Sequence, residues 1–174
     1  ECVLGKARNF RPHHLAAERE HAFDVDTYAA ALRLRDHLNS LGRSTPSPGR
    51  STIAVVGAGF TGIEVAAEMP DRLVRAGING SRRIILVDPN PAIGATIGEH
   101  ARPVIETALA SLDVETRLGV RVSSVEAAGV RLSSGEFIAT QTVIWCAGMR
   151  ASRLAANFPG ARDRLGRLLV DPFM

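Results

Sequence analysis

The sequence contains little cysteine, little lysine and few aromatic residues. It has two cysteines, one tryptophan and one tyrosine, and Lys6 is its only lysine. Cys2 and Cys146 are far apart and belong to no CxxC pair or metal-ligand cluster, so the sequence predicts neither a disulfide framework nor a metal site. The arginines alternate with acidic residues and lack interleaved aromatic rings. We therefore interpret them as solvated surface residues and expect no nucleic-acid partner.

Long apolar runs are also missing. No stretch approaches the roughly 18 to 20 residues needed to span a bilayer, and residues 1–6 lack the charged start and apolar core of a signal peptide. Hydrophobic residues make up 45% of the 174 and charged residues 22%, with a formal net charge of +3. This composition is typical of a folded globular domain. We expect a cytoplasmic protein.

The first part of the chain consists of an irregular segment, a helix, a linker and a strand. Residues 1–23 show no regular period, whereas the residues after Asp26, the expected N-cap, favour a helix that Gly42 ends. Residues 44–49 have the composition of a linker. Residues 52–56 are apolar on both faces and rich in β-branched side chains, which indicates a strand buried in a parallel sheet.

Two helices and two strands are expected next. A helix should begin near Phe60, and Pro70 should kink or restart it. Residues 84–87 indicate a second buried strand, residues 102–112 a helix and residues 114–116 a short strand. The expected apolar faces are Ile63, Ala66, Ala67, Pro70, Leu73 and Val74 in the first helix, and Val104, Ile105, Ala108 and Leu112 in the second.

The last part of the chain changes in character. Residues 120–139 alternate between polar and apolar and are broken by glycine-containing turns, which predicts an antiparallel meander. Residues 142–146 indicate a final buried strand. The order of elements predicts an α/β fold, in which a Rossmann-like parallel sheet has helices on both faces and an inserted antiparallel β-meander.

The strongest motif is the sequence GAGFTG at residues 57–62, between a predicted strand and a predicted helix. In this context GxGxxG is the fingerprint of dinucleotide binding. Gly57 allows the tight turn, Gly59 lets the backbone approach a pyrophosphate, and Gly62 lets the helix pack on the strand. The amides of residues 60–62 then face the anion at the positive end of the helix. The alternative is a glycine-rich turn without a ligand.

Asp88 ends the second strand, 26 residues after Gly62. Dinucleotide-binding folds place an acidic residue about 20 residues after the motif, and the long first helix accounts for the excess. A carboxylate there accepts hydrogen bonds from the adenine ribose and repels a 2′-phosphate, which predicts NADH rather than NADPH. Arg82 and Arg83 precede the strand and lie about 15 to 20 Å away, at ~3.3 Å per residue. The alternative is a turn-forming aspartate before Pro89.

Two features flank these residues. Glu64, in the first turn of the helix, is either a carboxylate favoured by the helix dipole or a group near the nicotinamide, and its spacing leaves both open. The last strand ends in a Trp-Cys-Ala-Gly turn at the carboxyl edge of the sheet, where ligands bind in such folds. We interpret Cys146 as structural, while Ala147 and Gly148 are small enough for a ligand to approach closely.

These residues resemble the NADH-binding motif of flavoproteins with two dinucleotide-binding domains, the pyridine nucleotide-disulfide oxidoreductase superfamily. Within it, residues 22–174 are most similar to type II NADH dehydrogenases. The sequence FTGIE at residues 60–64, the Trp-x-Ala-Gly turn at residues 145–148 and the helix that starts at residues 26–27 are typical of that branch.

The resemblance implies that Glu64 lies beside the nicotinamide and that Ala147 and Gly148 border the cofactor. It implies hydride transfer from NADH to FAD, followed by electron transfer to an acceptor such as a quinone. We assign no catalytic acid, base or nucleophile. The cofactor-binding candidates are Gly57, Gly59, Phe60, Thr61, Gly62, Glu64, Asp88, Val122, Ala147 and Gly148.

Such flavoproteins carry an earlier GxGxxG motif for FAD and a later Gly-Asp flavin motif, and this sequence has neither. We expect residues 51–150 to be an NADH-binding domain, residues 26–50 a helix and linker, and residues 1–25 and 151–174 strips of an absent FAD domain. That domain is the expected partner, the isolated chain is expected to be inactive, and the parent could lie at the inner face of a membrane. A stand-alone NAD-binding or sensor module, or a ferredoxin-reductase-type component, is the alternative.

Overall fold

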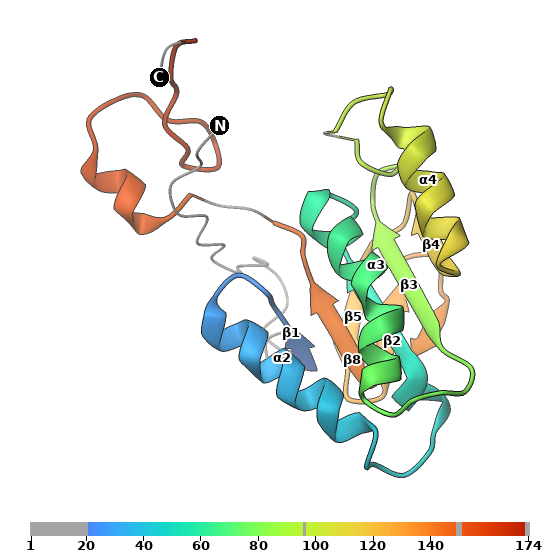
Figure 1. The fold of residues 1–174 in the computed structure, drawn as a ribbon. Coiled ribbons are helices and arrows are strands. Elements are labelled where there is room, and N and C mark those ends of the chain that lie inside the picture. The colour runs from blue at the N-terminus through green and yellow to red at the C-terminus, as the bar shows by residue number, and fades with distance from the viewer. Residues whose placement is uncertain (1–20, 96, 149–150, 173–174) are drawn as a thin grey trace. The chain divides into compact units, whose positions relative to one another are not determined.

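The computed structural model describes residues 21–95, 97–148 and 151–172 (Figure 1). The chain divides into two compact units, one that ends at Ala147 and one that includes the residues from Gly148 onward, and each is described by itself. Most of the strip expected at residues 1–25 lies outside the described residues.

A five-stranded parallel sheet forms the centre of the first unit. The strand order is β1-β8-β2-β3-β4, and every neighbouring pair is parallel. All five residues of β2 are buried, which explains its apolar, β-branched sequence, because a central parallel strand packs on both faces. The four strands predicted for this sheet are confirmed. The strands span Ala22–Phe23 (β1), Thr52–Val56 (β2), Arg83–Asp88 (β3), Val114–Leu118 (β4) and Thr142–Trp145 (β8).

A separate antiparallel sheet confirms the predicted meander. Its strands, in the order β5-β6-β7, span Val122–Glu126, Gly129–Leu132 and Phe137–Ala139. Apolar side chains of this sheet pack on one face of the parallel sheet. The buried residues of this core are Val125, Val130, Leu132 and Ile138 from the meander, and Ala54, Val56, Ile85, Val87 and Val143 from the parallel sheet.

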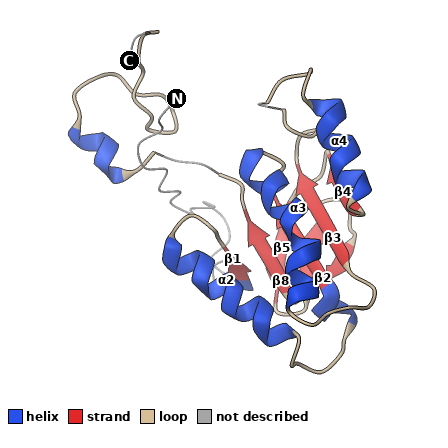
Figure 2. Cartoon of the chain, viewed as in Figure 1, coloured by secondary structure: helices blue, strands red, loops and turns tan. Residues whose placement is uncertain are grey.

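Helices cover the other face (Figures 1 and 2). They are α2 (Tyr28–Leu41), α3 (Phe60–Arg75) and α4 (Arg102–Ser111), and a short 3-10 helix, η1 (Pro48–Ser51), precedes β2. The Rossmann-like fold with an inserted meander is confirmed, but the helices of the described part share one face rather than covering both, because the meander already covers the second. Within the described residues, no helix has the length and apolarity needed to cross a membrane.

The structure corrects two details of α2 and α3. Thr27, not Asp26, is the N-cap of α2, and its Oγ1 accepts a hydrogen bond from the Ala30 backbone nitrogen at 3.1 Å. Helix α3 continues through Pro70 and does not restart there. Proline cannot donate a backbone hydrogen bond. The burial of side chains before and after Pro70 offsets this loss. The buried residues around it are Ala66, Met69 and Leu73.

The buried face of α4 is narrower than predicted. Leu109 is buried and Ile105 half-buried, whereas Val104 is 71% exposed and Ala108 is also exposed. Helix α4 packs on β4, which is the edge strand, and on α3. At the edge of the sheet only a narrow stripe of the helix is covered. Val74 in α3 is likewise exposed, contrary to the predicted apolar face.

The second unit is rich in turns and held by polar contacts. It contains η2 (Arg153–Asn157) and an antiparallel bridge between Arg162 and Leu168. Asp163 accepts hydrogen bonds from the backbone and the guanidinium of Arg167, and these hold the pKa of Asp163 below its ordinary value. The assignment of residues 151–174 to a strip of an FAD domain stays a prediction. The exposed apolar side chains of this unit are Leu154, Phe158, Leu169 and Val170.

His37 links α2 to the start of β8. Its Nε2 lies 2.9 Å from Thr142 Oγ1, and its ring contacts that of Phe23 at a centroid distance of 4.4 Å. Burial lowers the pKa of His37, while a hydrogen bond with the backbone of Gln141 acts in the opposite direction. The folded protein therefore favours the neutral imidazole.

We predict that the free energy of unfolding falls as the pH drops below about 6.5, the ordinary pKa of histidine. Because the pKa of His37 is lower in the folded state, the unfolded state takes up the proton first. This stability is complete above the unfolded pKa and is lost as the pH falls toward the folded pKa. Urea unfolding at pH 7.5 and 5.5 measures the loss, which His37→Gln should reduce. An equal loss in both proteins would contradict this role.

Candidate functional site

The turn between β2 and α3 begins at Gly57, which has a φ of +105°. Its backbone nitrogen donates to the carbonyl oxygen of Val87 on β3 at 2.7 Å. A Cβ at this position would lie 2.9 Å from the backbone nitrogen of Ala147. Glycine is therefore required both by the backbone angle and by the close approach of the segment that follows β8.

Gly59 and Gly62 have different physical reasons to be glycine. A Cβ at Gly62 would lie 1.7 Å from the carbonyl oxygen of Gly57, so this residue is needed for the contact between helix and turn. Gly59, the N-cap of α3, has an ordinary φ of −83°, and a Cβ there would have nothing within 4 Å. Nothing in the folded chain requires glycine at position 59, whereas a ligand placed against this backbone would.

The last residue of β3 and the segment after it hold the turn at Ala58. Asp88 Oδ2 accepts a hydrogen bond from the Ala58 nitrogen at 2.6 Å, and the Gly94 nitrogen donates to the Ala58 oxygen at 3.0 Å. Asp88 is 7% exposed, and its Oδ1 accepts from the backbone and the side-chain nitrogen of Asn90, both at 2.7 Å. The acidic residue predicted to contact the ligand thus also braces the glycine-rich turn.

The N-terminus of α3 opens beside this turn. The Ile63 nitrogen donates to the Gly59 oxygen at 3.0 Å. In an α-helix the backbone nitrogens of the first turn lie at the open N-terminal end. Phe60 is 60% exposed, Thr61 is half-buried, and Glu64 is exposed. A group of amides at the positive end of a helix is suited to a phosphate anion.

The remaining predicted residues lie in three different positions. Ala147 is beside Gly57, as the close approach shows. Gly148 has a φ of +80° and belongs to the second unit. Val122 begins β5 and packs on the core under the meander, and the loop before it reaches the end of β3, where the Val120 nitrogen donates to the Asp88 oxygen at 3.3 Å.

Arg83 lies at the opposite end of β3 from Asp88, as the sequence predicts. Its guanidinium donates to both carboxylate oxygens of Glu115, at 2.7 and 2.9 Å. Arg117 contacts both Glu115 and Glu136. The hydrogen bond between Arg83 and Glu115 raises the pKa of the guanidinium and lowers that of the carboxylate. Arg83 is therefore engaged away from the glycine-rich turn.

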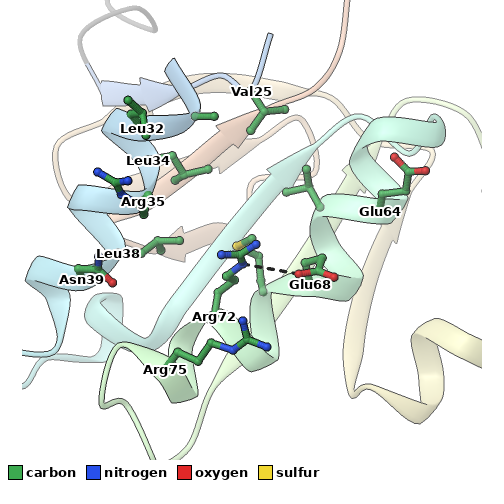
Figure 3. Close-up of a pocket in the computed structure, with 13 residues that line it drawn as sticks. Val25, Leu32, Leu34, Arg35, Leu38, Asn39, Glu64, Glu68, Arg72 and Arg75 are labelled. Atoms are coloured by element: carbon green, nitrogen blue, oxygen red, sulfur yellow. Dashed lines mark ion pairs between the residues drawn. The ribbon is translucent and has the colours of Figure 1, made fainter. Parts of the chain in front are cut away.

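A groove of about 570 Å³ lies between α2 and α3 (Figure 3). Leu34 and Leu38 point into it from α2, and Arg72 forms an ion pair with Glu68 at 3.5 Å. Glu64 is the one predicted site residue in its lining, and the glycine-rich turn is not part of it. The groove and the turn are separate features, and a dinucleotide assignment depends on the turn.

Sequence reasoning missed Asn90 and Gly94. Asn90 follows Asp88 by two residues, which is the spacing of a turn in which an aspartate side chain accepts from the backbone. That signal was available in the sequence. The contact of Gly94 with Ala58 was not, because it joins two loops that only the folded chain brings together.

The strand, the glycine-rich turn and the helix place the chain in the class of Rossmann-like α/β domains. The sequence profile of the pyridine nucleotide-disulphide oxidoreductase family matches residues 4–174. The chain belongs to this family.

Three proteins illustrate the relationship. An NADH dehydrogenase-like protein of Mycobacterium tuberculosis is 52% identical over 158 residues, which cover 89% of this chain and 40% of that protein. The type II NADH:quinone oxidoreductase NdhA of the same organism is 33% identical over 71% of this chain and 30% of its own length. The structure of NDH2 from Plasmodium falciparum in complex with NADH matches with a TM-score of 0.73 and 18% identity, over 87% of this chain and 35% of that one. The chain thus spans less than half of these relatives.

The two glycines allow a matched test of the turn. We predict that Gly62→Ala destabilises the fold by about 1 to 3 kcal/mol, the usual effect of overpacking, because its Cβ would meet the Gly57 oxygen. Gly59→Ala should change the free energy of unfolding by less than about 1 kcal/mol, the scale of an N-cap change. Urea unfolding of both variants measures this, and equal effects would contradict the distinction.

Proposed function

We propose that residues 51–150 form an NADH-binding domain. The observation that carries the proposal is Gly59, which the folded chain does not need as glycine and which lies beside the N-terminus of α3. The pyrophosphate would lie against this residue and accept hydrogen bonds from the first amides of the helix. Ala147, next to Gly57, leaves room for the ligand because its side chain is small.

Asp88 supports a preference for NADH over NADPH. It ends β3 at the carboxyl edge of the sheet and is tied to the glycine-rich turn through Ala58. A ribose hydroxyl can donate to a carboxylate, whereas a 2′-phosphate is repelled by it. Arg82 and Arg83 do not offset this charge, because they lie at the opposite end of β3 from Asp88 and Arg83 binds Glu115.

The finer function that we propose is oxidation of NADH in an FAD-dependent oxidoreductase that passes electrons to an acceptor such as a quinone. The support is membership of an oxidoreductase family and the named activities of its relatives. The described residues contain one glycine-rich strand-turn-helix, which the NADH pyrophosphate would occupy, and so they do not fit FAD as well. We derive no catalytic step from this chain.

The task of these residues is to bind and orient NADH. The turn would fix the pyrophosphate, Asp88 would fix the adenine ribose, and the nicotinamide would then extend toward Glu64 and Ala147. Flavin chemistry, when such a group is present, supplies the hydride acceptor. The alternative function, an NAD-binding module without catalysis, would use the same binding residues. A longer form of such a protein would bind NADH but would not oxidise it.

We predict that the 174-residue chain binds NADH at least about tenfold more tightly than NADPH, the ratio expected from ~1.4 kcal/mol of repulsion. Calorimetry with both ligands at one salt concentration measures the ratio, which Asp88→Asn should narrow because it removes the charge. Gly59→Val is the control and should lose binding with an unchanged circular dichroism spectrum, since its side chain would occupy the pyrophosphate position. Equal or tighter binding of NADPH by the wild type would refute the assignment.

We predict that the same chain purifies without a flavin spectrum and does not oxidise NADH at a measurable rate. One glycine-rich motif can hold one pyrophosphate, and hydride transfer requires two rings held about 3 to 3.5 Å apart. Absorption between 350 and 500 nm, with an NADH oxidation assay before and after FAD is added, tests this. A stoichiometric flavin spectrum would contradict the proposed division of roles.

A further inference from the structure

The carboxylate of Asp88 is almost fully committed before any ligand arrives. Oδ1 accepts hydrogen bonds from the backbone nitrogen and from Nδ2 of Asn90, both at 2.7 Å, and Oδ2 accepts from the Ala58 nitrogen at 2.6 Å. A carboxylate oxygen offers about two acceptor positions. Both positions on Oδ1 are therefore used, and one remains on Oδ2.

The orientation of the Asn90 amide follows from the chemistry of its partner. An ionised carboxylate only accepts hydrogen bonds, so the NH₂ group of Asn90 must face Asp88. A second contact holds the backbone of Asn90, because the backbone carbonyl oxygen of Asn90 accepts a hydrogen bond from the Gly119 nitrogen at 2.9 Å. Asn90 is thus fixed between the end of β3 and the loop that leads into the meander.

We propose that Asn90 is a positioning residue for recognition of the adenine ribose. By occupying Oδ1, its side chain holds the carboxylate of Asp88 in the rotation that keeps Oδ2 on Ala58 and leaves the remaining position of Oδ2 for one ribose hydroxyl. The last torsion of an aspartate side chain is soft, so the carboxylate would turn more freely without this contact. The inference rests on the proposed binding of NADH.

A positioning residue and a purely structural turn residue would have different effects on the affinities for NADH and NADPH. NADH would donate the 2′-hydroxyl of its adenine ribose to Asp88, whereas NADPH carries a phosphate at this position. Loss of the Asn90 contact should therefore weaken NADH binding while leaving NADPH binding unchanged. A residue that only maintains the loop would affect both ligands equally, because both use the same glycine-rich turn.

Three variants of the 174-residue chain test the proposal by calorimetry with NADH, and by competition with NADPH, at pH 7.5 and one salt concentration. Asn90→Ala should weaken NADH binding by about threefold to tenfold, the scale of one hydrogen bond to a charged group, with less than a twofold change for NADPH. Asn90→Ser keeps a short donor and should restore NADH binding to within about twofold of the wild type. Thermal unfolding without ligand reports the stability of each variant.

Asn90→Asp keeps the shape of the side chain and replaces the donor by a second carboxylate. At pH 8 the two like charges should weaken NADH binding, and at pH 5.5 a shared proton should restore much of it, because one of two close carboxylates has a raised pKa. The wild type should show less dependence on pH. This variant keeps the proposal testable if Asn90→Ala does not fold.

The results of these experiments distinguish a failure of the proposed role of Asn90 from a failure of the proposed NADH binding. If the wild type binds NADH, three results would overturn the role of Asn90 alone. Asn90→Ala could bind NADH as tightly as the wild type, or it could lose affinity equally for NADH and NADPH. Asn90→Asp could lose affinity for NADH by the same factor at both pH values. A wild-type chain that binds neither ligand would overturn the proposed function and this inference with it.

Discussion

The backbone of Ala58 is the point on which the candidate site depends. Its nitrogen donates to Asp88 Oδ2 at 2.6 Å, and its oxygen accepts from the Gly94 nitrogen at 3.0 Å. Both backbone polar groups of this one residue are thus satisfied, by the last residue of β3 and by the segment that follows it. A hydrogen bond to a buried carboxylate is stronger than one between neutral groups, so the turn is held in shape without a ligand. Such preorganisation reduces the entropy lost on binding.

The close packing around the turn decides which glycines have a structural role. Gly57 meets the segment after β8, and Gly62 meets the turn itself, so both would be needed in a protein that bound nothing. Gly59 has no such neighbour. The motif therefore contains two glycines that fold the site and one whose small size is explained by a ligand, and a pattern of letters alone does not separate them.

The sequence predicted those parts of the fold that depend on local pattern. Thr52–Val56 was predicted to be a buried strand because it is apolar on both faces. The alternation of polar and apolar residues over residues 120–139 predicted a meander. The distribution of layers was less accessible. Nothing in the apolar pattern of β2 tells whether Ala54 and Val56 face a helix or a sheet, and in the folded chain they face the meander.

Helix faces and loop contacts were predicted less well for the same reason. Val104 is exposed because α4 lies against an edge strand, which the helix sequence does not report. Asp88 was found from its place after a strand, but its bonds to Ala58 and Asn90 depend on how two loops meet. The position of Glu64 in the lining of the groove between α2 and α3 likewise depends on how two helices pack against each other, which the sequence of neither helix reports.

An NMR titration tests the central claim most directly, because it reports on each backbone amide of the glycine-rich turn. NADH is added to the ¹⁵N-labelled chain and the amide shifts are followed by residue. The account predicts that the largest changes occur at Gly59, Phe60 and Thr61, with changes at Ala147 as well. Absence of change at these amides, or changes centred on the groove between α2 and α3, would contradict it.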